Sequence, residues 1–307
     1  MNPTFSAWRI GGYCILGVCA IWLTACVGPT ADKKQATGRA LESITLMLPG
    51  GVPLEMVRIP AGSFEMGSRD SERNRYDNEG PAHRVDIAYD FYIGKYPVTQ
   101  SQWLAVMGDY PAYWQWLKES GKHKDYGIGA DHPIYNVAWK QITGPDGFLE
   151  RVNHHLMNSE QGASLVRLPS ESEWEYACRG RTTTCFSFVD SHESKTEKRS
   201  EYMWFYFNSS EINYGCKPVG QKKPNPFGLY DMHGNLWEFC RDRYHLDYDG
   251  APTDGSAWEE GALDARRVIR GGSWLFHSRD ARSACRMARN PSRGGETDGF
   301  RVALNVR

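Results

Sequence analysis

The sequence lacks an excess of charge of either sign, because 36 Lys and Arg residues are balanced by 37 Asp and Glu residues for a formal net charge of −1. Without a basic surplus to neutralise phosphates, the chain is not expected to bind nucleic acid. Beyond the N-terminal region it also lacks an apolar run of about 18 residues, which excludes a polytopic membrane protein. The chain is rich in Gly (31), Trp (11), Tyr (16) and Phe (12), which indicates a loop-rich fold with an irregular aromatic core.

The sequence also lacks any Cys-x-x-Cys spacing, so a zinc ribbon or a thioredoxin-type motif has no support. Of the eight cysteines, three lie near the N-terminus. The other five are Cys178, Cys185, Cys216, Cys240 and Cys285. One or two disulfides among these five are compatible with an oxidising compartment, and their connectivity stays open.

The N-terminal region is predicted to direct export. Residues 10–23 form an apolar run of signal-peptide length, preceded by a segment whose only charged side chain is Arg9. The run ends in Leu23-Thr24-Ala25-Cys26, which resembles the lipobox of bacterial lipoproteins, where the cysteine is acylated and becomes the N-terminus after cleavage. Residues 1–25 are therefore predicted to be a lipoprotein signal peptide with Cys26 as the lipidation site. The alternative is an ordinary signal peptide with a chance cysteine.

Residues 26–41 have the small and polar composition of a flexible tether, and residues 42–307 are predicted to form one domain. The lipobox resemblance implies a lipoprotein of the bacterial cell envelope that faces the periplasm and contacts the membrane through its lipid anchor only. Because Val27 rather than Asp follows the cysteine, the outer membrane is favoured over the inner one, and this choice stays open.

Alternating apolar residues predict two strands over residues 55–67, joined as a hairpin by a Pro-Ala-Gly turn. The nearly all polar segment 69–80 is predicted to be a solvated loop, and a strand is expected through Val85, Ile87 and Tyr89.

Capping boxes predict two helices. Thr99 and Gln102 indicate a helix over 100–107 that stops at Gly108. Ser170 and Glu173 indicate a helix that ends at Gly180. Apolar residues at helical spacing predict a further helix over 146–158, whose His154 and His155 are adjacent in sequence and point to different faces, so they form no metal pair.

Seven separated sequence blocks match one family in the expected order. They are MVRIPAGSFEMGS (56–68), VTQSQW (98–103), HPIYNVAW (132–139), RLPSESEWEYA (167–177), NPFGLYDMHGNLWEF (225–239), RGGSW (270–274) and GFRV (299–302). Over residues 52–307 the chain resembles the formylglycine-generating enzyme, or sulfatase-modifying factor, family. The resemblance implies an α+β single domain with little regular secondary structure, a variant of the C-type lectin fold.

The copper site of that family is missing. In the formylglycine-generating oxidases, two cysteines downstream of the Gly-Gly-Ser block bind copper(I), a soft ion that prefers thiolates. The matching positions here are Phe276 and Ala281. Cys285 lies nearby, but one thiolate cannot reproduce a two-sulfur site, so copper is not expected and the question of iron stays open.

The resemblance carries over a calcium site with more support. Asp231, Gly234, Leu236 and Glu238 match positions where the family offers oxygen ligands, which suit a hard cation. Asn208 and Ser209 resemble the start of a weaker second calcium site. The alternative is that Gly234 and Asn235 form a turn while Trp237 packs in the core.

Two classes of function follow from the resemblance. The first is non-copper oxidative maturation of a periplasmic peptide or protein, by analogy with relatives that act in pyoverdine maturation. The alternative is a non-catalytic lectin-fold binding module, either an accessory envelope lipoprotein that binds a partner protein or a variable protein that displays a ligand-binding surface.

No catalytic residue is assigned. His277 is a weak candidate for a general base or metal ligand, since histidine titrates near neutral pH, and an exposed loop side chain is the alternative. Arginines are frequent around the motifs and are predicted to pair internally, with Glu173, Asp231 or Asp298 as partners, rather than to bind an anionic ligand. These arginines are Arg167, Arg270, Arg282, Arg286 and Arg301.

Overall fold

A computed structural model describes residues 41–111, 114–115, 119, 126–159, 165–188, 196–209, 214–261 and 266–306. All of them belong to one compact unit, Ala40–Arg307, in agreement with the predicted single domain. The predicted signal peptide, Cys26 and all of the tether except Leu41 lie outside the described residues. Within the described part, the helices are too short or too polar to cross a bilayer.

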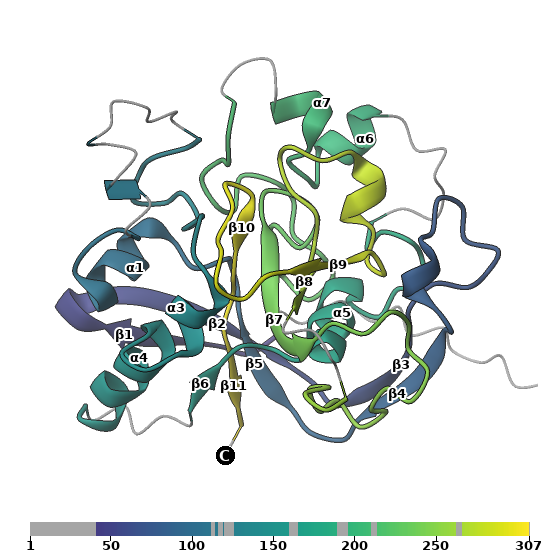
Figure 1. Ribbon diagram of the computed structural model, residues 1–307, viewed down its shortest axis with the longest axis horizontal. Coiled ribbons are helices and arrows are strands. Elements are labelled where there is room, and N and C mark those ends of the chain that lie inside the picture. Colours follow the sequence, from purple (N-terminus) through teal and green to yellow (C-terminus); the bar gives the residue numbers. More distant parts are fainter. Residues whose placement is uncertain are drawn as a thin grey trace, which may run out of the picture. The chain divides into compact units, whose positions relative to one another are not determined.

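The fold is built from three small sheets and short helices, as the α+β prediction requires (Figure 1). The five-stranded sheet is antiparallel. Its strands, in spatial order, are β1 (Ser43–Leu48), β2 (Val52–Ile59), β5 (Phe91–Gly94), β11 (Ala303–Asn305) and β6 (Val166–Arg167). Alternate residues of β1 and β2, such as Leu46, Leu48, Leu54 and Met56, are buried, which gives this sheet one core-facing side.

The second sheet supports the segments that carry the family motifs. Its order is β10 (Asp298–Gly299), β7 (Trp237–Arg243), β8 (Arg267–Arg270) and β9 (Arg286–Arg289). The β10–β7 pair is parallel, and the other pairs are antiparallel. The third sheet contains only β3 (Gly62–Met66) and β4 (His83–Ile87), which pair antiparallel.

The predicted hairpin over 55–67 is wrong. Its two strands exist, but β2 pairs with β1 and β5 whereas β3 pairs with β4. Asp90 holds the corner between them, because its carboxylate accepts a 2.7 Å bond from the Ala61 N–H and pairs with Arg58 at 2.7 Å. Alternating apolar residues identify a strand but leave its partner unspecified.

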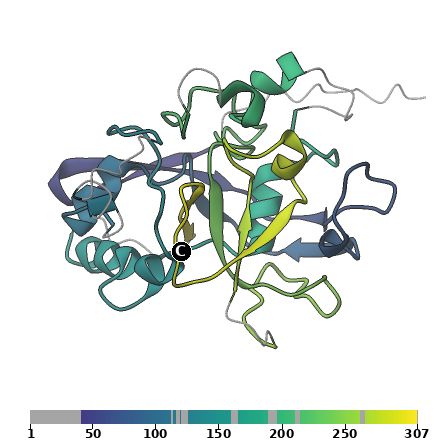
Figure 2. The ribbon, with the colours of Figure 1, turned by 45° about the horizontal axis from the view of Figure 1, so that its top comes forward.

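The two helices with capping boxes are confirmed. They are α1 (Gln100–Met107) and α5 (Glu171–Arg179), and each ends at a glycine in the left-handed region, Gly108 or Gly180. The helix predicted over 146–158 is α4 (Phe148–Met157). The remaining helices are α3 (Trp139–Thr143), α6 (Thr196–Ser200), α7 (Tyr206–Ser209) and the 3-10 turns η1 (Pro49–Gly51), η2 (Asp77–Glu79) and η3 (Ser278–Ala281). Figures 1 and 2 show α1, α3 and α4 at one end of the sheets and β3 and β4 at the other.

Large aromatic side chains fill the core, as the composition indicates. Trp103, Trp174, Trp237 and Trp274 are at most 1% exposed. The ring of Trp103 stacks on that of Phe148 with their centroids 5.6 Å apart. The core can therefore be irregular, since a few large rings bridge short elements.

Buried arginines connect these elements. Each of the four least exposed ones pairs with glutamate: Arg270 with Glu175, Arg282 with Glu79 and Glu72, Arg286 with Glu171, and Arg301 with Glu238. The prediction of internal pairing is confirmed, including the 2.6 Å contact of Arg167 with Glu173. Two of the carboxylates predicted as partners of these arginines have other partners. Asp298 pairs with Arg289, and Asp231 accepts a hydrogen bond from the Gly220 N–H.

The prediction that residues 69–80 form a solvated loop is wrong in one respect. Glu79 is fully buried, and Arg282 donates to both Glu79 and Glu72, at 2.7 Å for Glu72. The loop is thereby anchored on the segment that connects β8 and β9 of the second sheet. Local polarity could not reveal this anchor, because Arg282 is far away in the sequence.

Candidate functional site

Phe276 and Ala281, which the family resemblance matches to the copper-binding cysteines of the oxidases, are packed apolar groups in this structure. Ala281 is 1% exposed and packs with Cys185, Phe186 and Met203 among others. Phe276 is partly buried and its ring lies edge-on to Trp237, with the centroids 5.7 Å apart. The surrounding structure therefore supports these positions by packing, and the donor set that copper(I) requires is not present at them.

Burial favours the protonated form of several thiols. Cys178, Cys185, Cys216, Cys240 and Cys285 are all buried, and none of the disulfides left open by the sequence forms among them. Burial raises the pKa of the Cys178 thiol to about 12 and that of Cys185 to about 11, and it raises the pKa of Cys285 as well. A thiol that stays protonated at neutral pH is a poor ligand and nucleophile.

An exposed aromatic surface lies next to the former copper positions. The rings of Tyr206 and Phe207, on α7, lie 5.0 and 5.4 Å from that of His277. Tyr206 is 40% exposed and Phe207 57%. The Tyr206 N–H donates to the Phe276 carbonyl at 2.9 Å, which ties α7 to the segment after β8. We call Tyr206, Phe207 and His277 the α7 aromatic surface.

His277 is exposed, and its contacts are rings rather than acids. Within the described residues it has no carboxylate partner that would orient it as a general base. The structure therefore places the weak catalytic candidate in an aromatic surface. Sequence reasoning missed Tyr206 and Phe207, for which two consecutive aromatic residues before Asn208 were the only local signal.

A hollow of about 830 Å³ adjoins α7 and is lined by Trp204, Asn208, Tyr214 and Lys217 among others. The Tyr214 ring is 47% exposed and lies 4.6 Å from that of Trp274. Burial lowers the pKa of Lys217. The hollow extends the surface with further rings and a cation, which suits a ligand with both apolar and polar groups.

The predicted calcium loop is organised around internal hydrogen bonds. Asp231 accepts from the Gly220 N–H at 2.8 Å, and burial raises the pKa of its carboxyl to about 6. Glu238 instead accepts from Trp174 Nε1 and Arg301 Nε, each at 2.6 Å. The turn at Gly234 and Asn235 is present, with φ values of 85° and 64°.

The structure thus places Asp231 close to the turn at Gly234, whereas the carboxylate of Glu238 forms an ion pair with Arg301. Within the described residues, no group of three or more His, Cys, Asp or Glu side chains is arranged to hold a metal. Asn208 of the weaker second site accepts from the Phe205 N–H and donates to the Met203 carbonyl, each at 2.9 Å, and Ser209 is its neighbour. Calcium at either place stays a prediction.

A buried histidine lies behind the former copper positions. His233 is 3% exposed, and its Nδ1 lies 2.7 Å from the Ala281 carbonyl oxygen. Its Nε2 lies 2.9 Å from Ser187 Oγ and 3.2 Å from the Ser187 backbone nitrogen. A neutral ring with its proton on Nδ1 satisfies this set, and burial lowers the pKa of His233 to about 4.

This histidine predicts a pH dependence of stability. The unfolded imidazole takes up a proton near pH 6.5, so the contribution of His233 to stability is complete above that pH and is lost as the pH falls toward 4. We expect the stability difference between the native protein and His233→Gln to shrink by about 2 kcal/mol from pH 7 to pH 5. Urea unfolding of both proteins at both pH values measures it.

The difference between the two proteins is the informative quantity. Burial raises the pKa of Asp231 to about 6 and that of Asp242 to about 7, so these carboxyls act in the opposite direction as the pH falls. They are present in both proteins and cancel in the difference. A difference that stays constant from pH 7 to pH 5 would show that His233 does not remain neutral in the fold.

The three sheets, the short helices and the RGGSW block (270–274) define the class of the fold, a formylglycine-generating-enzyme-type variant of the C-type lectin fold. Residues 50–306 match the family described as the Sulfatase-modifying factor enzyme 1-like domain, and the chain belongs to that family. Formylglycine-generating enzyme from Mus musculus is 29% identical, with 82% of this chain and 75% of the mouse protein covered.

Two solved structures support the same assignment. PvdO from Pseudomonas aeruginosa is 31% identical with a TM-score of 0.67, covering 83% of this chain and 95% of that one. Treponema denticola variable protein 1 is 25% identical with a TM-score of 0.67, covering 86% of this chain and 99% of that one. A serine/threonine-protein kinase, pkn1 of Chlamydia caviae, is 31% identical over 82% of this chain, which spans only 38% of the kinase.

Proposed function

We propose that this protein is a bacterial envelope lipoprotein that binds a periplasmic peptide or an envelope partner protein without copper chemistry. One observation carries the proposal: Phe276 and Ala281 fill the copper positions, and the exposed rings of the α7 aromatic surface cluster beside them. Large rings contribute most of the binding energy at many protein interfaces.

Removing the rings tests the binding surface. We expect Tyr206→Ala/Phe207→Ala to weaken binding at least about tenfold, because interface aromatics commonly contribute more than 1 kcal/mol each. A photo-crosslinking amino acid at position 207 in intact cells identifies the partner by mass spectrometry, and calorimetry with the purified partner then gives the affinity. Leu246→Ala, at a side chain 76% exposed, is the matched control. Equal affinity of the double variant and the control would refute the proposed surface.

The envelope location is part of the proposal and has its own test. With Cys26 as the lipidation site and the membrane contacted only through the lipid, Cys26→Ser is expected to move the protein from the membrane fraction to the soluble periplasmic fraction. Fractionation followed by immunoblotting measures this shift. An unchanged distribution would contradict lipidation at Cys26.

The second candidate function is non-copper oxidative maturation of a periplasmic peptide or protein, and the similarity to PvdO favours it. Oxygen uptake in the presence of a cysteine-containing peptide, together with elemental analysis of residues 42–307, separates the two functions. Oxygen consumption together with stoichiometric copper or iron would favour oxidative maturation over binding as the function. Calcium alone, near one ion per chain, would agree with binding and with a structural site at Asp231.

A further inference from the structure

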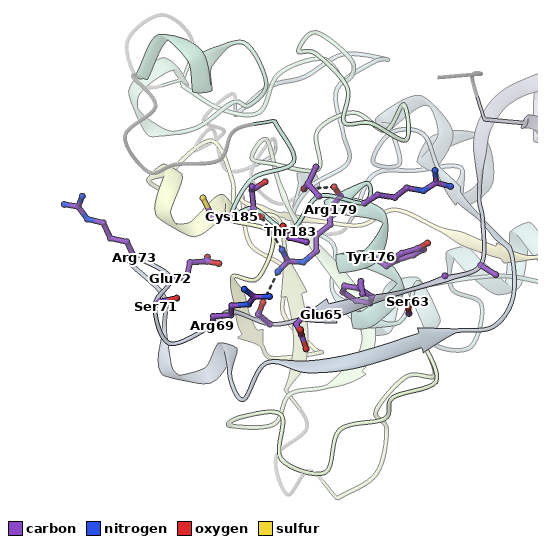
Figure 3. Close-up of a pocket in the computed structure, with 17 residues that line it drawn as sticks. Ser63, Glu65, Arg69, Ser71, Glu72, Arg73, Tyr176, Arg179, Thr183 and Cys185 are labelled. Carbon is purple, nitrogen blue, oxygen red and sulfur yellow. Dashed lines mark hydrogen bonds between the residues drawn. The ribbon is translucent and has the colours of Figure 1, made fainter. Parts of the chain in front are cut away.

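A second pocket, of about 680 Å³, lies on the side of the domain formed by β3 (Figure 3). Residues 61–65 and 67 line it along β3, together with the start of the charged loop, Tyr176 and Arg179 of α5, and the segment 181–185 that follows α5. None of the residues of β4 lines it. The pocket therefore runs along the edge of β3 that faces away from its partner strand.

This edge of β3 is open. In a two-stranded sheet, each strand has one edge whose backbone groups lack a partner strand. Among the described residues, the backbone of Gly62–Met66 makes no hydrogen bond outside its pairing with β4. Next to the strand, the Gly67 N–H donates to Glu175 and the Gly67 carbonyl accepts from Arg179. The backbone groups that are available to an additional strand therefore end before Gly67. An open edge of five residues is long enough to accept an additional strand.

Three arginines at the pocket are left without an acidic partner. Arg69, Arg73 and Arg181 are exposed, and none of them forms an ion pair with a described residue. The neighbouring charges are already matched, because Glu72 pairs with Arg282 and Arg179 pairs with Glu175. Glu65 remains as one acidic side chain on the lining. The local excess is positive on a chain whose overall charge is nearly neutral.

The cations lie at both ends of the pocket. Figure 3 shows Arg69 and Arg73 toward the end formed by the charged loop, and Tyr176 toward the other end. Arg181 belongs to the Tyr176 end, because its guanidinium lies 5.5 Å from the ring centroid of Phe227, which is 5.9 Å from that of Tyr176. A ligand that reaches all three arginines has to be extended.

We propose that this pocket binds an extended acidic peptide segment of a partner protein. The peptide backbone pairs with the open edge of β3 as an additional strand, and its carboxylates contact Arg69, Arg73 and Arg181. The hydroxyl group of Thr183 lies on the lining and can donate to a remaining carboxylate oxygen. This site shares no residue with the α7 aromatic surface, so each can fail independently of the other.

Fluorescence anisotropy tests the site with the full chain in an uncharged detergent. The probe is a fluorescein-labelled heptapeptide of alternating aspartate and valine. We expect saturable binding that is at least about tenfold weaker for Arg69→Gln/Arg73→Gln/Arg181→Gln and for the peptide with asparagine in place of aspartate. Arg293→Gln, at an exposed arginine outside the pocket, is the matched control and is expected to bind as the native protein does.

Strand pairing has a separate readout. An aspartate peptide with N-methyl groups on alternate amides keeps its charge but loses backbone donors, and we expect it to bind at least about tenfold more weakly. Absence of binding, equal binding by the triple variant, or equal binding of the asparagine peptide would overturn the proposal. Equal binding of the N-methylated peptide with displacement by inorganic phosphate would also overturn it, in favour of a site for small anions.

Discussion

Replacing Glu238 with glutamine is expected to lower the free energy of unfolding by about 3–5 kcal/mol, because it leaves a buried guanidinium without its counter-charge. Glu238 and Arg301 are both 0% exposed, and the two oxygens of Glu238 accept from Arg301 at 2.6 and 2.7 Å. Trp174 donates to the same carboxylate. The loss is the cost of breaking the pair, which exceeds what the intact pair contributes relative to an apolar replacement.

Urea unfolding of the native protein and of Glu238→Gln measures this effect. Arg301→Gln should lower the free energy of unfolding by a similar amount, since it leaves the buried carboxylate of Glu238 without its counter-charge. Glu42→Gln is the control: it breaks the exposed pair with Arg58 and should change stability far less. The measurement also tests the predicted calcium site, because a ligand role for Glu238 would make added calcium stabilise the native protein and not the variant. A loss well below that of a buried pair would contradict the structural role of Glu238.

Gly234→Ala is expected to destabilise the fold by roughly 3–5 kcal/mol through backbone strain and a steric clash. Gly234 has φ of 85°, where a side chain is disfavoured, and a Cβ at this position would meet the carbonyl group of Trp204, with the carbonyl carbon 2.9 Å away. The same carbonyl accepts from the Asn235 N–H at 2.9 Å, and the Gly234 N–H donates to the Gly271 carbonyl at 2.7 Å. The backbone cannot move away without breaking both bonds.

Gly228 provides the control that separates strain from clash. Its φ is 80°, but a Cβ there would meet nothing within 4 Å. Gly228→Ala should therefore cost only the conformational penalty of about 1–2 kcal/mol. Comparing the urea midpoints of the two variants isolates the contribution of the close approach to Trp204. Equal losses at the two glycines would show that the approach of Gly234 to Trp204 does not constrain the fold.

The helices α1 and α5 could be predicted from the sequence because their signals are local, whereas α3, α6 and α7 were not predicted. In each capping box the side chain of one residue and the backbone of another three positions away satisfy each other, as Thr99 with Gln102 and Ser170 with Glu173 do. The stops at Gly108 and Gly180 depend on the freedom of glycine to adopt positive φ. None of these interactions requires knowledge of the rest of the chain.

The candidate site could be predicted only in part. The loss of the copper cysteines is visible in the sequence, since Phe276 and Ala281 are counted from a nearby motif. The exposure of Tyr206 and Phe207 is not, because most aromatic residues in the described part of the chain are buried or partly buried and no local pattern marks the exceptions. The acidic-peptide pocket was also hidden, since its arginines come from segments more than 100 residues apart.

The sequence by itself determined the family, the order of its motifs, the ends of α1 and α5, and the presence of Phe276 and Ala281 where the family resemblance places the copper cysteines. All of these rest on residue identity and on interactions between near neighbours. Only the tertiary structure decided that β3 pairs with β4 rather than with β2, that Glu238 pairs with Arg301, and that Glu79 is buried in an ion pair with Arg282. Strand partners and ion pairs are chosen by which segments the folded chain brings together. An alternating strand or a charged side chain satisfies its own requirements equally well with several partners, so its own sequence does not select one.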